Sequence, residues 1–186
     1  MLRSKKIILI TKAWRVNDMN DLKVFTEANK VQCKLLQKSS TQETLKAHEA
    51  LRLLGYAVEP DQMIKALVCI PVVDGKYQTD KALLAMVSGM HRLSLEKLQK
   101  AIGYEKIVIA DQKTAEKLSG YPRGGTPPIA HEAKLTVVMD EHLAKQQMLY
   151  GGGGTTEYVL EITPSEIMRT VKDIQKSDVV IAAIHE

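Results

Sequence analysis

The sequence has 186 residues, 45% of them hydrophobic and 26% charged, with a formal net charge of +4. This size and composition predict one globular domain over residues 1–186, with residues 1–18 as an N-terminal extension. No run reaches the roughly 18–20 apolar residues of a membrane span, and the mild positive charge permits a nucleic-acid partner without requiring one. The only two cysteines, Cys33 and Cys69, form no CxxC pair. That usage favours a reducing compartment, so we expect a cytoplasmic protein.

The first half of the chain mixes helical and strand-like periodicity. Asp18, Asn20 and Asp21 can cap one helix, and Ser39, Ser40 and Thr41 can cap a second. The pair Asp74-Gly75 is typical of a hairpin turn. Residues 81–87 would form the partner strand, although their alanine and leucine content also suits a helix. In chain order we expect a short strand or an extension at 6–10, a helix at 22–30, a strand at 31–37, a helix at 41–54 ended by Gly55, and a strand at 64–73.

The second half begins with clear capping signals. Ser94 and Asp111 each precede a helical segment, and Thr163 is followed by Pro164, which is favoured in the first turn of a helix. The helices are spaced irregularly among the strands, so strict βαβ alternation is not indicated. We therefore expect an α+β domain around a mixed, largely antiparallel and curved sheet. Its later elements are a helix at 95–103, strands at 104–110, 134–140, 147–154, 157–162 and 178–184, and helices at 112–120, 141–146 and 163–171.

Lys65 is the first candidate for chemistry, because it opens a strongly apolar strand. A lysine there can extend its ammonium group to water while its stem covers the core. Alternatively, the ammonium can point into a pocket and bind a phosphate or carbonyl oxygen. The strand pattern by itself leaves both interpretations open.

Two glycine-rich segments are the other candidates. The proline loop, residues 124–128, consists of Gly124, Gly125, Thr126, Pro127 and Pro128. Glycine allows close approach of the backbone and proline stiffens it, so this loop is either a surface turn or a preformed set of N–H donors. The glycine turn, residues 151–154, includes Gly152, Gly153 and Gly154 and lies between two strands. It is either a hairpin tip or a place where a ligand approaches the main chain.

Other kinds of site find little support. The histidines at 48, 91, 131, 142 and 185 are scattered and show no HxxxH or HExxH spacing, so no metal site is expected. Both cysteines lie in apolar strands and fit the core better than a nucleophilic site. No GxSxG motif is present.

Taken in order, four stretches carry a resemblance to a known family: QMIKALVCI, which contains Lys65, then ALLAMVSGMHRLSLEKLQKAIGYEKIVIA, LSGYPRGGTPP and VVMDEHLAKQQMLYGGGGTTEYVLEITPSEIM. The chain resembles the YbaK and prolyl-tRNA-synthetase-associated editing domain family of aminoacyl-tRNA deacylases over residues 21–173. It departs from the family in having Cys33 where many members carry a tyrosine, in lacking a histidine after that strand, and in having Met90 in place of an acidic residue.

The resemblance implies a barrel-like sheet flanked by helices and a free-standing, metal-independent enzyme that requires no cofactor. Such an enzyme hydrolyses the ester of a mischarged small amino acid, Ala or Cys, on proline tRNA. Lys65 would be catalytic, contacting the ester or the terminal nucleotide, and the proline loop and glycine turn would bind the aminoacyl group. A hydroxyl of the terminal adenosine would help to activate water. The partners would be aminoacyl-tRNA and a synthetase; the alternatives are a non-catalytic tRNA- or nucleotide-binding regulator and a purely structural interaction domain.

Overall fold

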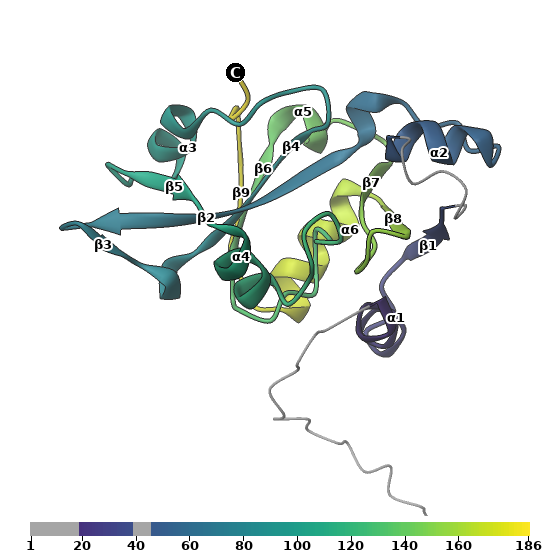
Figure 1. The fold of residues 1–186 in the computed structure, drawn as a ribbon, viewed down its shortest axis with the longest axis horizontal. Helices are drawn as coiled ribbons and strands as arrows, with labels where there is room; N and C mark the ends of the chain where they lie inside the picture. Colours follow the sequence, from purple (N-terminus) through teal and green to yellow (C-terminus); the bar gives the residue numbers. More distant parts are fainter. Residues whose placement is uncertain (1–18, 39–45) are drawn as a thin grey trace, which may run out of the picture.

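The computed structural model describes residues 19–38 and 46–186 (Figure 1). The strand or extension expected at 6–10, the extension at 1–18, and the caps at Asp18, Ser39, Ser40 and Thr41 lie outside these residues. The helices and strands in chain order are α1 (Met19–Ala28), β1 (Cys33–Gln37), α2 (Ala47–Leu53), β2 (Ile64–Val73), β3 (Lys76–Tyr77), β4 (Leu83–Ser88), α3 (Leu95–Ile102), β5 (Ile107–Ile109), α4 (Gln112–Ser119), β6 (Thr136–Asp140), α5 (Glu141–Ala144), β7 (Leu149–Gly152), β8 (Tyr158–Ile162), α6 (Pro164–Arg169), its π-helical continuation (Thr170–Ile174) and β9 (Val179–Ala182).

The predicted caps Ser94, Asp111 and Thr163 are confirmed, whereas Asn20 and Asp21, predicted as caps, lie inside α1. The Ser94 hydroxyl accepts a hydrogen bond from the Lys97 N–H and begins α3, and the Asp111 carboxylate accepts one from the Thr114 N–H and begins α4. Each of these caps satisfies a backbone donor that the first helical turn leaves unpaired. Both helices end at a glycine with positive φ, as C-terminal capping requires.

The predicted hairpin turn is also confirmed. Asp74 and Gly75 have φ angles of 50° and 73°, and Val73 pairs with Lys76 across the turn. Two residues with positive φ are what a tight two-residue hairpin needs. The short strand β3 follows the turn, and residues 83–88 then form β4, which pairs antiparallel with β2. The strand interpretation of this segment is therefore correct, and the helical one is not.

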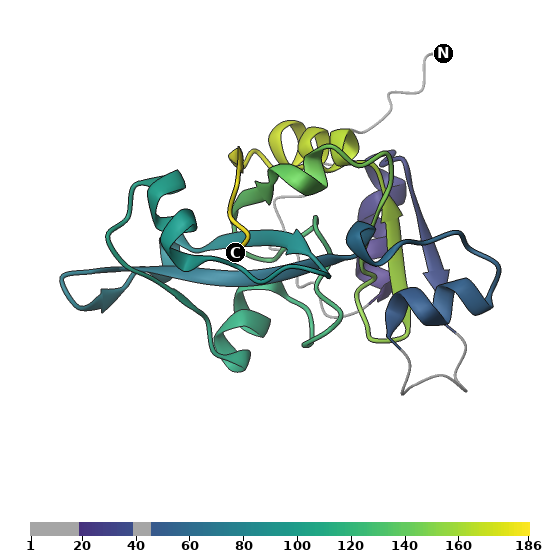
Figure 2. The same ribbon diagram turned by 90° about the horizontal axis from the view of Figure 1, so that it is seen from above.

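The strands form two sheets. The larger has the order β3-β2-β4-β6-β9, with β5 also paired to β2, and the smaller has the order β1-β8-β7. Only the pairs β4–β6 and β6–β9 are parallel; the other strand pairs of the described chain are antiparallel. A bridge from Met63 to Tyr150 joins the sheets where β2 begins (Figure 2). The predicted α+β class with a mixed, largely antiparallel sheet is confirmed, although the described strands wrap as two sheets rather than one closed barrel.

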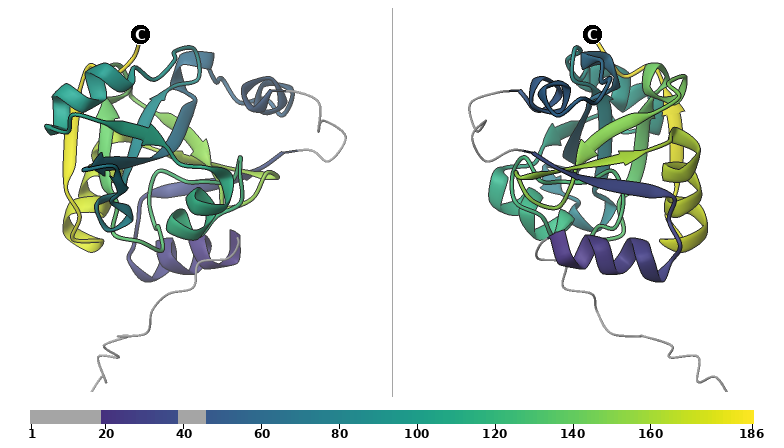
Figure 3. Two further views of the ribbon diagram at one scale, coloured as in Figure 1. Left: turned by 60° about the vertical axis from the view of Figure 1, so that its left-hand side comes forward. Right: turned by 90° about the vertical axis from the view of Figure 1, so that its right-hand side faces the viewer.

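Alternation along β2 separates two parts of the core. Ile64 and Val68 belong to a large apolar cluster with residues of α1, α6 and β8, whereas Cys69 on the opposite face packs with residues of α3 and β4. A third cluster holds α2 against the smaller sheet, and α1 lies on the opposite side of the molecule from α2 (Figure 3). Within the described ranges, no helix is long and apolar enough to span a membrane.

Candidate functional site

The structure brings the proline loop and the glycine turn into direct backbone contact. The N–H of Gly154 donates to the carbonyl of Gly125 over 2.8 Å. A Cβ atom added to Gly125 would lie 2.8 Å from the carbonyl oxygen of Gly154, and one added to Gly152 would lie 2.6 Å from the carbonyl carbon of Gly125. Real side chains do not approach so closely, so glycine is required at both positions. The two segments that the sequence marked separately thus form one wall made of main chain.

Two side chains donate hydrogen bonds to backbone carbonyls in and just after the proline loop. The His131 Nε2–H donates to the Pro127 carbonyl over 2.8 Å, and the Tyr121 hydroxyl donates to the Ala130 carbonyl over 2.9 Å. Burial lowers the pKa of His131 to about 4, although the hydrogen bond to Pro127 acts in the opposite direction. The imidazole is therefore neutral at neutral pH, with its proton on Nε2. These contacts hold the loop in place before any ligand binds.

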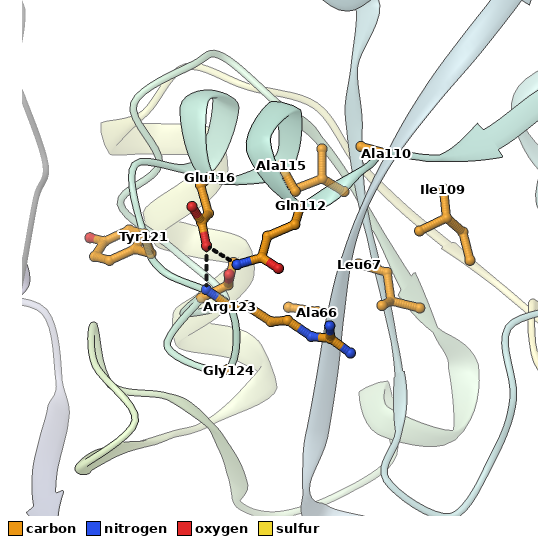
Figure 4. Close-up of a pocket in the computed structure, with 12 residues that line it drawn as sticks. Ala66, Leu67, Ile109, Ala110, Gln112, Ala115, Glu116, Tyr121, Arg123 and Gly124 are labelled. Carbon is orange, nitrogen blue, oxygen red and sulfur yellow. Dashed lines mark hydrogen bonds between the residues drawn. The ribbon is translucent and has the colours of Figure 1, made fainter.

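A cavity of about 340 Å³ lies between β2, the start of α4 and the proline loop (Figure 4). Gly124 and Thr126 line it on the side of the loop. Its wall is mainly apolar, and the charged side chains among its lining residues are those of Glu116 and Arg123. Figure 4 shows the Arg123 side chain extending towards Ala66 on β2. Small-ligand sites commonly combine an apolar cavity of this size with a few polar groups.

The cavity opens along a free edge of β2. Residues 64–69 pair with β4 on one side, but on the other side β5 begins to pair only at Cys69. The Val68 carbonyl accepts a hydrogen bond from the Ala110 N–H, so it points to this edge of β2. Peptide groups two residues apart on a strand point to the same edge, so those of Ala66 do as well. Among the described strands, Ala66 has no partner on this edge and lines the cavity. An unpaired strand edge presents N–H and C=O groups to a ligand.

Lys65 lies beside this cavity but not in its wall. Its side chain is exposed and leaves β2 on the face opposite to Ile64, and its Nζ donates to the His91 carbonyl over 2.5 Å. The neighbouring residues Ala66 and Leu67 line the cavity. The Ile64 side chain, in turn, approaches the position of Gly151. The candidate lysine and the two glycine segments therefore flank the start of β2 from opposite faces.

Three histidines that are scattered in the sequence lie together in the structure. The rings of His91 and His185 stack with centroids 4.6 Å apart, and His142 meets His91 edge-on at 5.2 Å. They follow the carboxyl ends of β4, β6 and β9, where the C-terminus also lies (Figure 1). No spacing in the sequence indicates this histidine cluster, because the three residues come together only where three strands end side by side. No group of three histidine, cysteine or acidic residues in the described part of the chain is arranged to hold a metal ion.

Asp140 anchors the histidine cluster. Its fully buried carboxylate accepts hydrogen bonds from the backbone N–H groups of His142, Ile184 and His185, and from the His185 Nδ1–H over 2.8 Å. Burial by itself raises the pKa of Asp140, but these hydrogen bonds outweigh it and hold the pKa below its ordinary value. The carboxylate stays ionised and ties the C-terminal segment to the end of β6.

Together these features define a domain that presents a main-chain wall and a small, mostly apolar cavity to a ligand. The model of the aminoacyl-tRNA editing domain family matches residues 41–170. The chain therefore belongs to this family, and it is an aminoacyl-tRNA editing domain of the YbaK type.

Individual relatives agree with the family. The chain is 26% identical over 142 residues to the "Putative Cys-tRNA(Pro)/Cys-tRNA(Cys) deacylase EbsC" of Enterococcus faecalis, covering 76% of this chain and 82% of that protein. It is 28% identical over 130 residues to a proline–tRNA ligase of Desulforamulus reducens, covering 69% of this chain but only 21% of the ligase. The crystal structure of a "putative trans-editing enzyme for prolyl tRNA synthetase" superimposes with a TM-score of 0.71 at 25% identity, over 90% of this chain and 96% of that one.

Proposed function

We propose that this domain acts in trans as a deacylase, hydrolysing the ester between a mischarged small amino acid, Ala or Cys, and proline tRNA. The observation that carries the proposal is the packing of Gly125 against Gly152 and Gly154 beside the cavity of about 340 Å³. The N–H groups of Gly125, Gly153 and Gly154 already donate to carbonyls of the domain, so the oxyanion that forms during ester hydrolysis would be stabilised by other N–H groups of the proline loop, such as that of Thr126 at the cavity. The names of the relatives point to the same reaction.

The cavity supports a small substrate side chain. Ala66, Ala110 and Ala115 contribute short side chains to its wall. The aminoacyl group would lie there, against the proline loop, and the ribose would pass the start of β2. Lys65, next to Ala66 in the chain, would then reach the ester or the terminal nucleotide from the opposite face of the strand.

The reaction is a water attack on the ester. The water oxygen bonds to the carbonyl carbon, the bond from that carbon to the ribose oxygen breaks, and the leaving oxygen takes up the proton that water gives up. The free hydroxyl neighbouring the ester on the terminal ribose would orient and activate this water. In that role the substrate supplies the group that elsewhere comes from a protein base. No metal ion or cofactor takes part in this scheme.

Release of amino acid from a panel of charged tRNAs tests the proposal. Ala, Cys, Ser, Thr and Pro on proline tRNA, each also on its own cognate tRNA, would be assayed with the wild type and with Lys65→Ala. We expect Ala or Cys to be released from proline tRNA, and Lys65→Ala to slow that release about 100-fold or more. The variant should keep its stability within about 0.5 kcal/mol, because the Lys65 side chain is exposed.

Lys81→Ala is the matched control, since this exposed lysine lies outside the cavity and outside the histidine cluster. It should release amino acid at the wild-type rate. If wild-type protein that is folded released no amino acid from any tRNA, the deacylase proposal would be wrong. If Lys65→Ala kept full activity, the role given to Lys65 would be wrong.

A further inference from the structure

Among the residues that the structure describes, the wall of the cavity contains one carboxylate, that of Glu116. Glu116 lies on α4 and lines the cavity, and its Oε1 accepts hydrogen bonds from the Arg123 N–H over 3.1 Å and from the Gln112 Nε2 over 2.9 Å (Figure 4). Two donors on one oxygen fix the orientation of the group. In this orientation the half-buried carboxylate lies in the cavity wall.

The charge of Glu116 is not matched by a cation of the protein. Within residues 19–38 and 46–186, Glu116 forms no ion pair, and its second oxygen has no hydrogen-bond partner. The Arg123 backbone binds Glu116, but the Arg123 side chain extends instead towards β2 (Figure 4). A preoriented carboxylate with a free oxygen in a mostly apolar cavity is suited to a small cationic donor.

We infer that Glu116 binds the α-ammonium group of the aminoacyl ester. This rests on the proposed function and names the part of the substrate that this residue selects. An α-aminoacyl ester with a small side chain has one ammonium group and little apolar surface. The cavity is complementary to it, because Glu116 supplies one negative charge and the alanine side chains supply a small apolar wall. The Arg123 guanidinium, which lies on the β2 side of the cavity (Figure 4), would bind the phosphate of the terminal nucleotide and so orient the substrate.

The inference has a consequence for substrate choice. An ester whose α-nitrogen is acylated, as in peptidyl-tRNA, carries no ammonium group and would cover the second oxygen of Glu116 without giving it a partner. Burying a charge in that state is unfavourable. The domain should therefore bind aminoacyl esters and reject N-acylated ones.

Binding can be tested apart from hydrolysis. Two acceptor-stem RNAs would carry alanine through a 3′-amide, which resists cleavage; one has a free α-amine and the other is N-acetylated. We expect the wild type to bind the free amine about 10- to 100-fold more tightly, the range for hydrogen bonds to charged groups. Glu116→Gln retains the acceptor oxygen but loses the charge, so it should bind the two RNAs almost equally. Glu105→Gln, at an exposed glutamate outside the cavity, should keep the wild-type preference.

The outcomes separate this inference from the proposed function. Equal binding of both RNAs by the wild type, binding of neither, or an unchanged preference in Glu116→Gln would each overturn the inference. A wild type that prefers the free amine, and loses that preference in Glu116→Gln, supports it whether or not the esters are hydrolysed. The deacylation panel then decides on the reaction by itself. Thermal unfolding of the three proteins shows whether each variant is folded.

Discussion

Adding one methyl group at Gly152 should separate the two segments that form the main-chain wall. The Cβ of an alanine there would lie 2.6 Å from the carbonyl carbon and oxygen of Gly125, and closer still to the carbonyl oxygen of Thr126. All three atoms belong to backbone, so no side chain can rotate away. The proline loop must move, although the hydrogen bond from His131 to the Pro127 carbonyl holds it in place.

The cost can be estimated from the structure. Overpacking a well-packed site costs about 1–3 kcal/mol, and an obstruction by backbone places Gly152→Ala near the upper end. For a protein of this length, about 2–3 kcal/mol lowers the melting temperature by roughly 5–10 °C. A shift of the loop by about 1 Å should lower deacylation about 100-fold at temperatures where the variant remains folded.

Two other glycines provide controls for the same chemical change. Gly55 has a φ of 88° and nothing within 4 Å of an added Cβ, so Gly55→Ala should cost about 1 kcal/mol of stability without changing activity. At Gly151 an added Cβ would meet the Pro128 Cδ at 2.9 Å. This Cδ belongs to a ring fixed to the backbone nitrogen and cannot rotate away, but the contact is longer than the 2.3–2.6 Å contacts at Gly152, so Gly151→Ala should give an intermediate result.

Thermal unfolding and the deacylation rate at 20 °C should be measured for all three variants. If Gly152→Ala kept both the wild-type melting temperature and the wild-type rate, the close packing of the two segments would play no part in stability or function. If Gly55→Ala lost activity as severely as Gly152→Ala, general destabilisation would explain the loss.

Three further predictions concern stability and reactivity. Burial lowers the pKa of His131 to about 4 from the 6.5 of an unfolded chain, so the free energy of unfolding should fall by up to about 3 kcal/mol as the pH drops from 6.5 to 4. In urea denaturation of His131→Gln over the same pH range, this contribution to the fall should be absent. Asp140→Ala should cost about 3 kcal/mol or more in urea unfolding, since several backbone N–H groups lose their acceptor; a cost under about 1 kcal/mol would contradict this. Burial raises the pKa of Cys69 to about 12, so its thiol should resist alkylation at pH 8 until the protein unfolds, and rapid modification of native protein would refute the burial argument.

Local signals in the sequence determined much of the secondary structure. The caps at Ser94 and Asp111 and the turn at Asp74-Gly75 involve residues within a few positions of one another, so their physics is complete in a short stretch of chain. The same holds for the apolar run along β2, which indicated a buried strand. The helix expected at 41–54 begins only at Ala47, because Lys46 has an extended backbone and is its N-cap, so the expected start at 41 with caps at Ser39, Ser40 and Thr41 is wrong.

The sequence also pointed to the proline loop and the glycine turn, but it gave no physical reason to join them. Their contact depends on β7 pairing with β8 and meeting β2 at Met63, and these are contacts between residues far apart in the chain. Glu116 carried no signal at all, since it is one of several charged residues on α4 and only the fold turns it towards a cavity. Likewise, the histidine cluster forms only because the neighbouring strands β4, β6 and β9 end side by side, which brings His91, His142 and His185 together. Local hydrogen bonding and periodicity thus determined the elements, whereas the tertiary structure decided which of their residues share a site, because that depends on strand order and register.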